Sequence, residues 1–317
     1  MALSELIDLL SGVIQGSSIG PVLFLIYIDG LAKLLEHHGI TAKLFADDVK
    51  VYMVIENDLD AVKVQAALDI ISEWANDWQL SVSVAKCSVL KIGRNAAADV
   101  DLRLDSCTLP SVTHCRDLSV TITSDLSFTQ YITKIVSKAH RRANCILRSF
   151  TSGDTRLLLR AYIVYVRPLV EYNSIIWSPV TKHDIELVEK VQRRFTKRLR
   201  GLRNVSYSGR LAQLGLHTLE LRRLHLDLLF CYKIVFGLVN INCSDFFQFS
   251  VTNSTRGHKY KLFKPRCTSS LRQKFFVDRV INVWNALPPT VNFSKLFTFR
   301  TSIVNVDFSR FLVCNFE

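Results

Sequence analysis

A pair of adjacent aspartates inside an apolar stretch constrains this chain more than any other feature. Asp47 and Asp48 separate two short runs, residues 40–46 and 49–54, that are rich in apolar and β-branched residues. This pattern predicts a strand, a tight turn made by the two aspartates, and a second strand. Aspartate is also common in turns that bind nothing, but two neighbouring carboxylates repel each other unless a cation neutralises them. Mg²⁺ takes such hard oxygen ligands together with substrate phosphates, so the pair indicates a metal site for nucleotide chemistry.

Upstream of the aspartates, residues 12–21 form a loop punctuated by glycines that opens an apolar helix. In residues 15–18 the glycine permits close approach of the backbone to a ligand. Pro21 suits the first turn of the helix, because the N–H that it lacks would be unpaired there anyway. We expect the helix over residues 21–35, with an apolar face made of Leu23, Phe24, Tyr27, Ile28 and Leu31. An ordinary Gly-Pro helix start would produce the same pattern.

The charge of the chain is divided unevenly along its length. The net charge is +12 with a pI of about 9.4, which favours a polyanionic partner. Residues 1–100 hold 7 Lys+Arg against 13 Asp+Glu, or −6, which leaves 33 and 15 of the chain's 40 and 28, or +18, for residues 101–317. An acidic segment with the candidate metal site is therefore followed by a strongly basic one, as expected for a catalytic part followed by a part that grips nucleic acid.

Cysteine usage and hydropathy indicate the compartment. The eight cysteines show no C-x-x-C spacing, which in a chain of 317 residues predicts reduced thiols rather than a disulfide scaffold. The most apolar windows, residues 22–28 and 226–239, are too short or contain charged residues, so we expect no membrane span. We therefore expect an intracellular protein, in the nucleus, the cytoplasm or both.

The remaining elements are read from hydrophobic periodicity. Residues 58–80 predict a helix with Trp74 and Trp78 in its core face. Residues 81–92 suggest a strand pair with Lys86 near its turn, and residues 107–123 a short hairpin. Residues 95–98 are a small-residue linker near the expected domain boundary. Helical periodicity dominates residues 127–150, 154–172 and 215–239 and then fades.

One further helix, around residues 188–203, separates apolar from basic residues most clearly. Its apolar stripe consists of Val188, Val191, Phe195, Leu199 and Leu202. Its remaining surface is basic and includes Lys190, Arg193, Arg194, Lys197 and Arg198. A run of charged residues is usually just a solvated helix face. Here, however, the charges are nearly all positive, so the side chains repel one another unless an anion neutralises them. We expect it to bind a phosphate backbone.

Taken together, these stretches resemble the reverse transcriptase of non-LTR (LINE-type) retrotransposons, especially the jockey-like elements. Residues 12–21 match the family's G-V-P-Q-G-S-x-L-G-P, and residues 45–48 match its F-A-D-D. Further matches extend almost to the end of the chain, at residues 74–78, 86–87, 166–172, 191–195, 255–258 and 284–288. Their order and spacing make the resemblance specific.

The resemblance implies an α+β fold, namely a partial polymerase palm of antiparallel hairpins with packed helices, followed by mostly helical parts. The palm would occupy residues 1–124, a basic helical thumb residues 125–240, and a C-terminal extension residues 241–317. The activity would be RNA-directed DNA polymerisation, a two-metal nucleotidyl transfer to a primer 3′ end with Mg²⁺ or Mn²⁺. Its partners would be an RNA template, a DNA primer, dNTPs and other chains encoded by the element.

The resemblance also assigns roles to individual residues. Asp47 and Asp48 would be the catalytic, metal-binding pair. The residues against the incoming nucleotide and the template would be Gln15, Gly16, Ser17 and Phe45. Lys86 would approach the leaving pyrophosphate, and the basic residues of the helix around 188–203 would hold nucleic acid.

The chain also departs from the family pattern. The family's first metal-binding aspartate lies on a strand well upstream of the Gln-Gly-Ser loop, whereas only eleven residues precede Gly12 here. We therefore expect that the fingers and the first catalytic strand are missing, that an apolar strand edge is left unpaired, and that the chain alone has little or no activity. In addition, Ile14 replaces a proline and Ser119 replaces a glycine of the family.

Three functions consequently stay open from the sequence. The first is a reverse transcriptase domain or a piece of one. The second is a non-catalytic RNA- or DNA-binding remnant. The third is a helical interaction protein whose basic surface meets an acidic protein partner. Binding that weakens log-linearly with salt separates the second from the third.

Overall fold

The computed structural model describes residues 12, 16–93, 101–151, 153–250, 257–314 and 316. The chain divides into two compact units. The first contains the chain up to Cys115 together with Thr123–Asp125, and the second contains Arg116–Ile122 and the chain from Leu126 onward. The linker predicted over residues 95–98 and the loop residue Gln15 lie outside the described residues.

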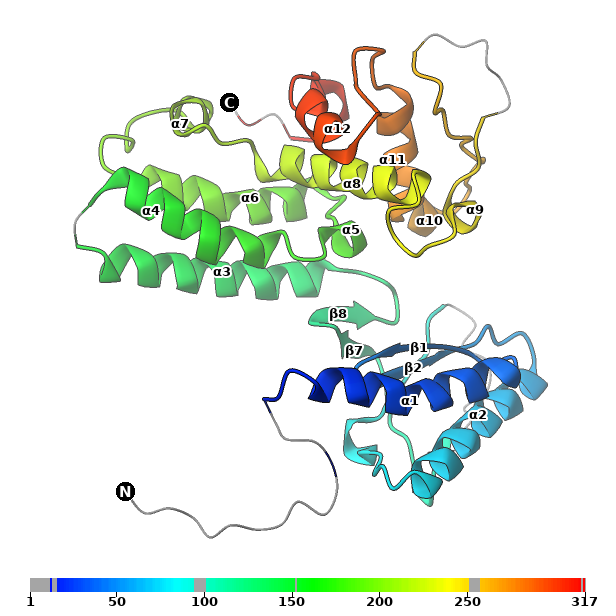
Figure 1. Ribbon diagram of the computed structural model, residues 1–317. Coiled ribbons are helices and arrows are strands. Elements are labelled where there is room, and N and C mark those ends of the chain that lie inside the picture. The colour runs from blue at the N-terminus through cyan, green and yellow to red at the C-terminus, as the bar shows by residue number, and fades with distance from the viewer. Residues whose placement is uncertain are drawn as a thin grey trace, which may run out of the picture. The chain divides into compact units, whose positions relative to one another are not determined.

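The first unit is built on two helices and one hairpin (Figure 1). Helix α1 (Gly20–His37) precedes β1 (Thr41–Phe45) and β2 (Asp48–Tyr52), and α2 (Asp58–Asp77) follows them. The helices predicted over residues 21–35 and 58–80 are thus confirmed. The core of the unit contains Ile28, Leu31 and Leu35 of α1 with Ala67, Ile71 and Trp74 of α2, and Ala42, Leu44, Val49 and Val51 of the hairpin pack against it.

The strand pair predicted for residues 81–92 is wrong. A 3₁₀ turn, η1 (Val84–Lys86), takes its place, because the backbone N–H groups of Lys86 and Cys87 donate to the nearby carbonyls of Ser83 and Val84. Only β3 (Val89–Leu90) is extended, and it pairs in parallel with β6 (Ser111–Val112). Between them, β4 (Arg103–Leu104) and β5 (Cys107–Thr108) form a short antiparallel pair.

The hairpin of β7 (His114–Asp117) and β8 (Val120–Thr123) has residues in both units and confirms the last part of the hairpin predicted over residues 107–123. Its two turn residues have positive φ angles, 41° at Leu118 and 70° at Ser119. Two-residue hairpin turns of this kind match the right-handed twist of the strands, but they favour glycine at both positions. The Tyr172 hydroxyl donates to the Leu118 carbonyl at 3.1 Å and fixes the turn.

The second unit begins with a layer of helices (Figure 1). Helix α3 (Thr129–Ser149) packs along α6 (Lys182–Lys197), and α4 (Thr155–Ala161) lies beside α3. The helix predicted over residues 154–172 changes character at Ala161: a π-helical turn η2 (Tyr162–Val166) leads into a 3₁₀ turn η3 (Arg167–Val170). Pro168 explains the change, because it cannot donate an N–H and its ring disfavours a regular helix before it. Two short helices, α5 (Ser174–Trp177) and α7 (Tyr207–Leu214), flank α6 in the sequence.

The rest of the second unit packs around α8 (Leu219–Val235). Its other elements are α9 (Cys243–Phe246), α10 (Ser270–Lys274), α11 (Phe276–Asn285), α12 (Leu296–Ile303) and the 3₁₀ turn η4 (Ser309–Phe311). The sequence analysis missed α11, although its buried apolar residues Phe276, Val277, Val280, Ile281 and Trp284 recur at helical spacing. Among the helices of the described residues, none is both long and apolar enough to cross a bilayer.

Candidate metal-binding turn and basic face

The two aspartates lie at the tip of the β1–β2 hairpin. The register pairs Phe45 with Asp48, so the turn consists of Ala46 and Asp47 and lies one residue earlier than predicted. The shift has a local cause: Ala46 adopts a left-handed φ of 51°, and a two-residue hairpin turn needs such an angle. Asp47 therefore occupies the turn and Asp48 the first position of β2, and both are exposed.

The outer face of this hairpin carries residues that the sequence analysis did not single out. Side chains alternate along a strand, so Lys43 shares its face with Phe45, and Lys50 shares its face with Asp48. Lys43 lies directly opposite Lys50 in the register, and Phe45 is 62% exposed. The two lysines thus place positive charge on this face of the hairpin. The period-2 alternation of residues 41–52 would have revealed the lysine pair.

The exposed aspartates fit a divalent ion as partial ligands. Within the described residues, no group of three or more His, Cys, Asp or Glu side chains could hold a metal. Mg²⁺ nevertheless is commonly held by one or two carboxylates and completed by waters and substrate phosphates. Asp47 and Asp48 match that kind of open site.

The other residues assigned to the nucleotide lie on separate elements. Ser17 accepts a hydrogen bond at Oγ from the Gly20 N–H at 3.1 Å, which fastens the loop to the first turn of α1. Gly16 has a φ of 86° and open space where a Cβ would be. Lys86 is exposed at the end of η1. Contact of these residues with a nucleotide stays a prediction.

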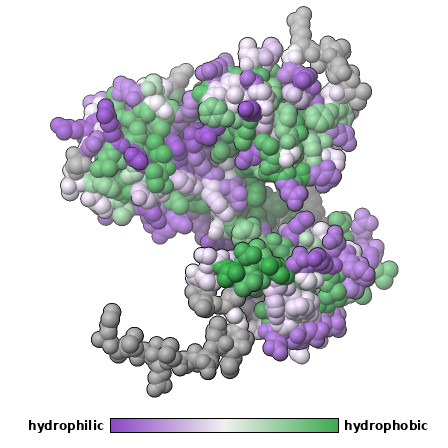
Figure 2. All heavy atoms as spheres, viewed as in Figure 1, coloured by the Kyte–Doolittle hydropathy of each residue, from purple (hydrophilic) through white to green (hydrophobic). Residues whose placement is uncertain are grey.

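The start of α1 differs from expectation in its burial. Leu23, predicted to be buried, is 41% exposed. Neighbouring apolar residues are exposed as well, namely Ile19, Val22, Leu25 and Ile26. Figure 2 shows apolar side chains gathered over this part of α1. The buried stripe begins only one turn later, at Ile28, because the hairpin and α2 cover the later turns of the helix.

Helix α6 carries most of the basic face that the sequence predicted. The helix ends at Lys197, however, so Arg198, Leu199 and Leu202 lie in the turns that follow it and not in a helix extending to residue 203. All five stripe residues are buried: Val188, Val191, Phe195, Leu199 and Leu202. Four of the five assigned cations are exposed: Lys190, Arg194, Lys197 and Arg198. Arg198 also donates to Asn144 Oδ1 of α3 at 2.9 Å, which ties the end of α6 to α3.

A buried polar network fixes the rotation of α6. The Gln192 side chain accepts from the Tyr162 hydroxyl at 3.2 Å and donates to the Tyr207 hydroxyl at 3.1 Å and the His217 carbonyl at 2.9 Å. Glu189 accepts from the Tyr207 hydroxyl and from the Leu219 N–H. Burial raises the pKa of Glu189, and burial together with Glu189 raises the pKa of Tyr207. The network was not visible in the sequence, because its members come from four separate segments.

Arg193 differs from the other four cations. It is half-buried, and its guanidinium lies 5.1 Å from the ring centre of Tyr207 and 5.2 Å from that of Phe316. Such cation–π contacts hold a guanidinium within the protein. Its nucleic-acid-binding role stays a prediction, but its geometry is that of a residue packed between two rings.

Positive charge also gathers where α3 meets α6. Burial lowers the pKa of His140 on α3, and the nearby Arg194 and Lys190 lower it further. Further exposed cations lie on α3, namely Lys134, Lys138, Arg141, Arg142 and Arg148. A field of one sign over two adjacent helices attracts polyanions and raises their association rate.

A hairpin with an exposed aspartate pair, followed by a basic helical face, is the combination expected of a nucleic-acid-dependent polymerase. The model of one family, described as reverse transcriptase (RNA-dependent DNA polymerase), matches residues 7–122. This match includes the turn, α1, α2 and the hairpin. Residues 7–122 therefore match the reverse transcriptase family, and the chain is similar to the reverse transcriptases of non-LTR retrotransposons.

Similar proteins point to the same group. The RNA-directed DNA polymerase from mobile element jockey of Drosophila melanogaster is 20% identical over 62% of this chain and 23% of its own length. The jockey polymerase of Drosophila funebris is 24% identical over 60% of this chain and 22% of its own length. An uncharacterized protein of Caenorhabditis elegans is 29% identical over 34% of this chain and 56% of its own length. The chain thus spans about a quarter of the jockey polymerases and about half of the nematode protein.

No solved structure gives a significant match.

Proposed function

We propose that the chain supplies part of the palm and the thumb of an RNA-directed DNA polymerase. The observation that carries the proposal is the exposed pair Asp47 and Asp48, at the tip of the β1–β2 hairpin and inside the residues that match the reverse transcriptase family. The first unit would be the palm part, and the basic helices from α3 to α8 the thumb that holds an RNA template and a DNA primer.

In this proposal Asp47 and Asp48 would hold a divalent ion, Mg²⁺ or Mn²⁺. The ion would act as a Lewis acid on the attacking and leaving oxygens of nucleotidyl transfer. The exposed ring of Phe45 offers an apolar surface next to the carboxylates, and Lys43 and Lys50 place positive charge on the same face for the phosphates of a primer or a dNTP.

Primer extension on an RNA template with Mg²⁺ or Mn²⁺ tests the catalytic proposal. If the chain incorporates dNTPs, Asp47→Asn should reduce incorporation by about a hundredfold or more, because it removes one charged group that acts on the transition state. Asp77→Asn, which changes another exposed aspartate at the end of α2, is the matched control and should leave the rate unchanged. Equal incorporation by Asp47→Asn and the control would contradict the role of the turn.

The four exposed cations of α6 favour a second candidate, nucleic-acid binding without catalysis. Each phosphate contact releases counterions, so log Kd varies linearly with log salt concentration. Arg194→Ala with Lys197→Ala should reduce that slope by about 1.4 to 1.8. Lys295→Ala with Arg300→Ala removes the same charge from the region of α12 and should not change it. A chain that binds template–primer in this way but never incorporates dNTPs would be a binding protein only, and an unchanged slope would remove α6 from the interface.

A further inference from the structure

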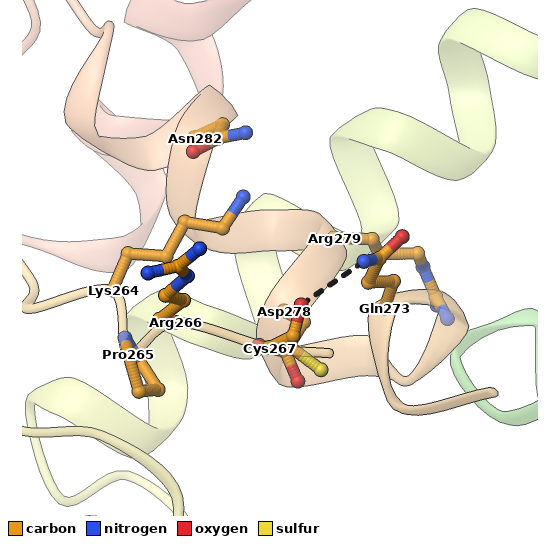
Figure 3. Close-up of a pocket in the computed structure, with 8 residues that line it drawn as sticks. All are labelled: Lys264, Pro265, Arg266, Cys267, Gln273, Asp278, Arg279 and Asn282. Carbon is orange, nitrogen blue, oxygen red and sulfur yellow. Dashed lines mark hydrogen bonds between the residues drawn. The ribbon is translucent and has the colours of Figure 1, made fainter. Parts of the chain in front are cut away.

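A cavity of about 540 Å³ lies in the second unit beside α11 (Figure 3). Its wall comes from residues 264–267, from Gln273 of α10, and from Asp278, Arg279 and Asn282 of α11. Its volume falls within the range of about 300–1,000 Å³ that is typical of small-molecule sites. Neither the reverse transcriptase match, which ends at residue 122, nor the basic face of α6 includes these residues.

Two of the charges at the cavity are already neutralised within the protein. Arg279 binds Asp227 through two contacts of 2.8 and 2.9 Å, and it also donates to the Ile175 carbonyl at 2.6 Å. Asp278 is 4% exposed, and its Oδ2 lies 2.9 Å from Arg272 Nε. These two ion pairs form a wall that carries no net charge.

Lys264 and Arg266 are the two charged residues of the cavity wall outside these ion pairs, and both are positive. Both are exposed, and within the described residues no ion pair neutralises either of them. Figure 3 shows both side chains directed to the side of the cavity where Asn282 lies. Their loop is held in place by Gln273, whose Nε2 donates to the Cys267 carbonyl at 3.1 Å. Two cations on one cavity repel each other until an anion lies between them.

We propose that this cavity binds a phosphate monoester or inorganic phosphate through Lys264, Arg266 and Asn282. Such a group carries about −1.5 to −2 charges near neutral pH, which matches the two free cations, whereas one phosphodiester carries only −1. Arg266 supplies a fork of N–H donors for two phosphate oxygens, Lys264 a point charge, and Asn282 an amide donor. The phosphate belongs either to the 5′ end of a nucleic-acid strand or to a free nucleotide or phosphate ion. The proposal does not depend on polymerase activity.

The test uses the full chain and three probes: inorganic phosphate by calorimetry, and one RNA oligonucleotide with a 5′-phosphate or a 5′-hydroxyl by fluorescence anisotropy. Lys264→Ala with Arg266→Ala should weaken phosphate binding at least about tenfold. Lys295→Ala with Arg300→Ala, with the same change in net charge, should leave it unchanged. Both substituted pairs are solvent-exposed, and circular dichroism verifies folding. Arg266→Lys, which keeps the charge but not the fork, should give an intermediate affinity.

The two oligonucleotides identify the source of the phosphate. Tighter binding of the 5′-phosphorylated strand than of the 5′-hydroxyl strand, lost in the Lys264/Arg266 variant but kept in the Lys295/Arg300 variant, would support a strand end. Equal binding of both strands, with phosphate binding that still depends on Lys264 and Arg266, would support a free phosphate or nucleotide. Phosphate binding that is absent from the unsubstituted chain, or unchanged in the Lys264/Arg266 variant, would overturn the proposal.

Discussion

The unit that carries the aspartate turn and the unit that carries the basic face bury their apolar residues to different extents. In the first unit the apolar start of α1 is exposed, and so are Phe45 on the hairpin and Leu59 and Val62 on α2. In the second unit the large residues Trp177, Phe195 and Trp284 are almost fully buried. The aspartate pair thus rests on a small core, whereas the basic face rests on a larger one.

This difference teaches that the two candidate activities depend on packing to different degrees. Regions with few buried contacts open locally at low free energy, whereas a large core opens only with the whole unit. We therefore expect a single core substitution to cost less free energy of unfolding in the first unit than in the second, and the basic face to be lost only together with its core. Substitutions in the two units test this expectation, and they follow from the largest expected effect to the smallest.

Phe195→Ala should produce the largest change. Phe195 is 1% exposed and stacks on Tyr162 at 4.8 Å, so its truncation should lower the free energy of unfolding by about 3–5 kcal/mol. Trp78→Ala in the first unit is the counterpart: Trp78 is 46% exposed, and its loss should cost much less. Urea unfolding followed by circular dichroism measures both. A larger cost for Trp78→Ala would reverse the comparison.

The second-largest effect should be the change of the second unit's free energy of unfolding with pH. Burial, with help from His217 and Arg222, lowers the pKa of His225 from 6.5 to about 4. The folded state thus keeps His225 neutral, and the stability this gives is present above about pH 6.5 and is lost as the pH falls toward 4, at most about 3 kcal/mol. His225→Phe removes this proton uptake, so unfolding measured between pH 4 and 7 should depend less steeply on pH than in the unsubstituted chain. Parallel pH profiles would show that His225 is not responsible.

Arg193→Gln should separate packing from nucleic-acid binding. The guanidinium lies against two rings and is partly desolvated, so its loss should lower the free energy of unfolding by about 1–2 kcal/mol. The salt dependence of RNA binding should stay as it is, in contrast to the Arg194→Ala and Lys197→Ala pair. A reduced slope with unchanged stability would place Arg193 on the binding surface instead.

Ser119→Gly should give the smallest effect, and it is the only one of these substitutions expected to raise the free energy of unfolding. Ser119 has a φ of 70° in the β7–β8 turn, an angle that costs a residue with a Cβ roughly 1 kcal/mol. Glycine should therefore raise the free energy of unfolding by about that amount, measured by thermal unfolding. Ser119→Ala removes the hydroxyl that accepts from Arg116 but keeps the Cβ, so it should give no gain. A gain from alanine would attribute the effect to the hydroxyl.

The sequence predicted those parts of the fold that depend on local periodicity. The buried stripe of α6 from Val188 to Phe195 follows directly from the helical repeat, and the β1–β2 hairpin from two apolar runs around a turn. The exact turn could not be predicted, because it depends on the left-handed backbone of Ala46, which has no signature in the side chain. Lys264 and Arg266 were missed for a different reason: their cavity forms only when a loop packs beside α11, a contact between separate segments.

The network around Gln192 has a consequence for how this region can diverge among related elements. The exposed cations Lys190, Arg194 and Lys197 would act on a polyanion through their charge, so lysine and arginine can replace one another there singly, in any order. Gln192 has partners at Tyr162, Tyr207 and the His217 carbonyl, and Glu189 shares Tyr207 with it. A change at Gln192 leaves buried polar groups without hydrogen-bond partners unless those partners change too. Related sequences should therefore vary freely along the outside of α6 and change in concert, as linked sets, along its inside.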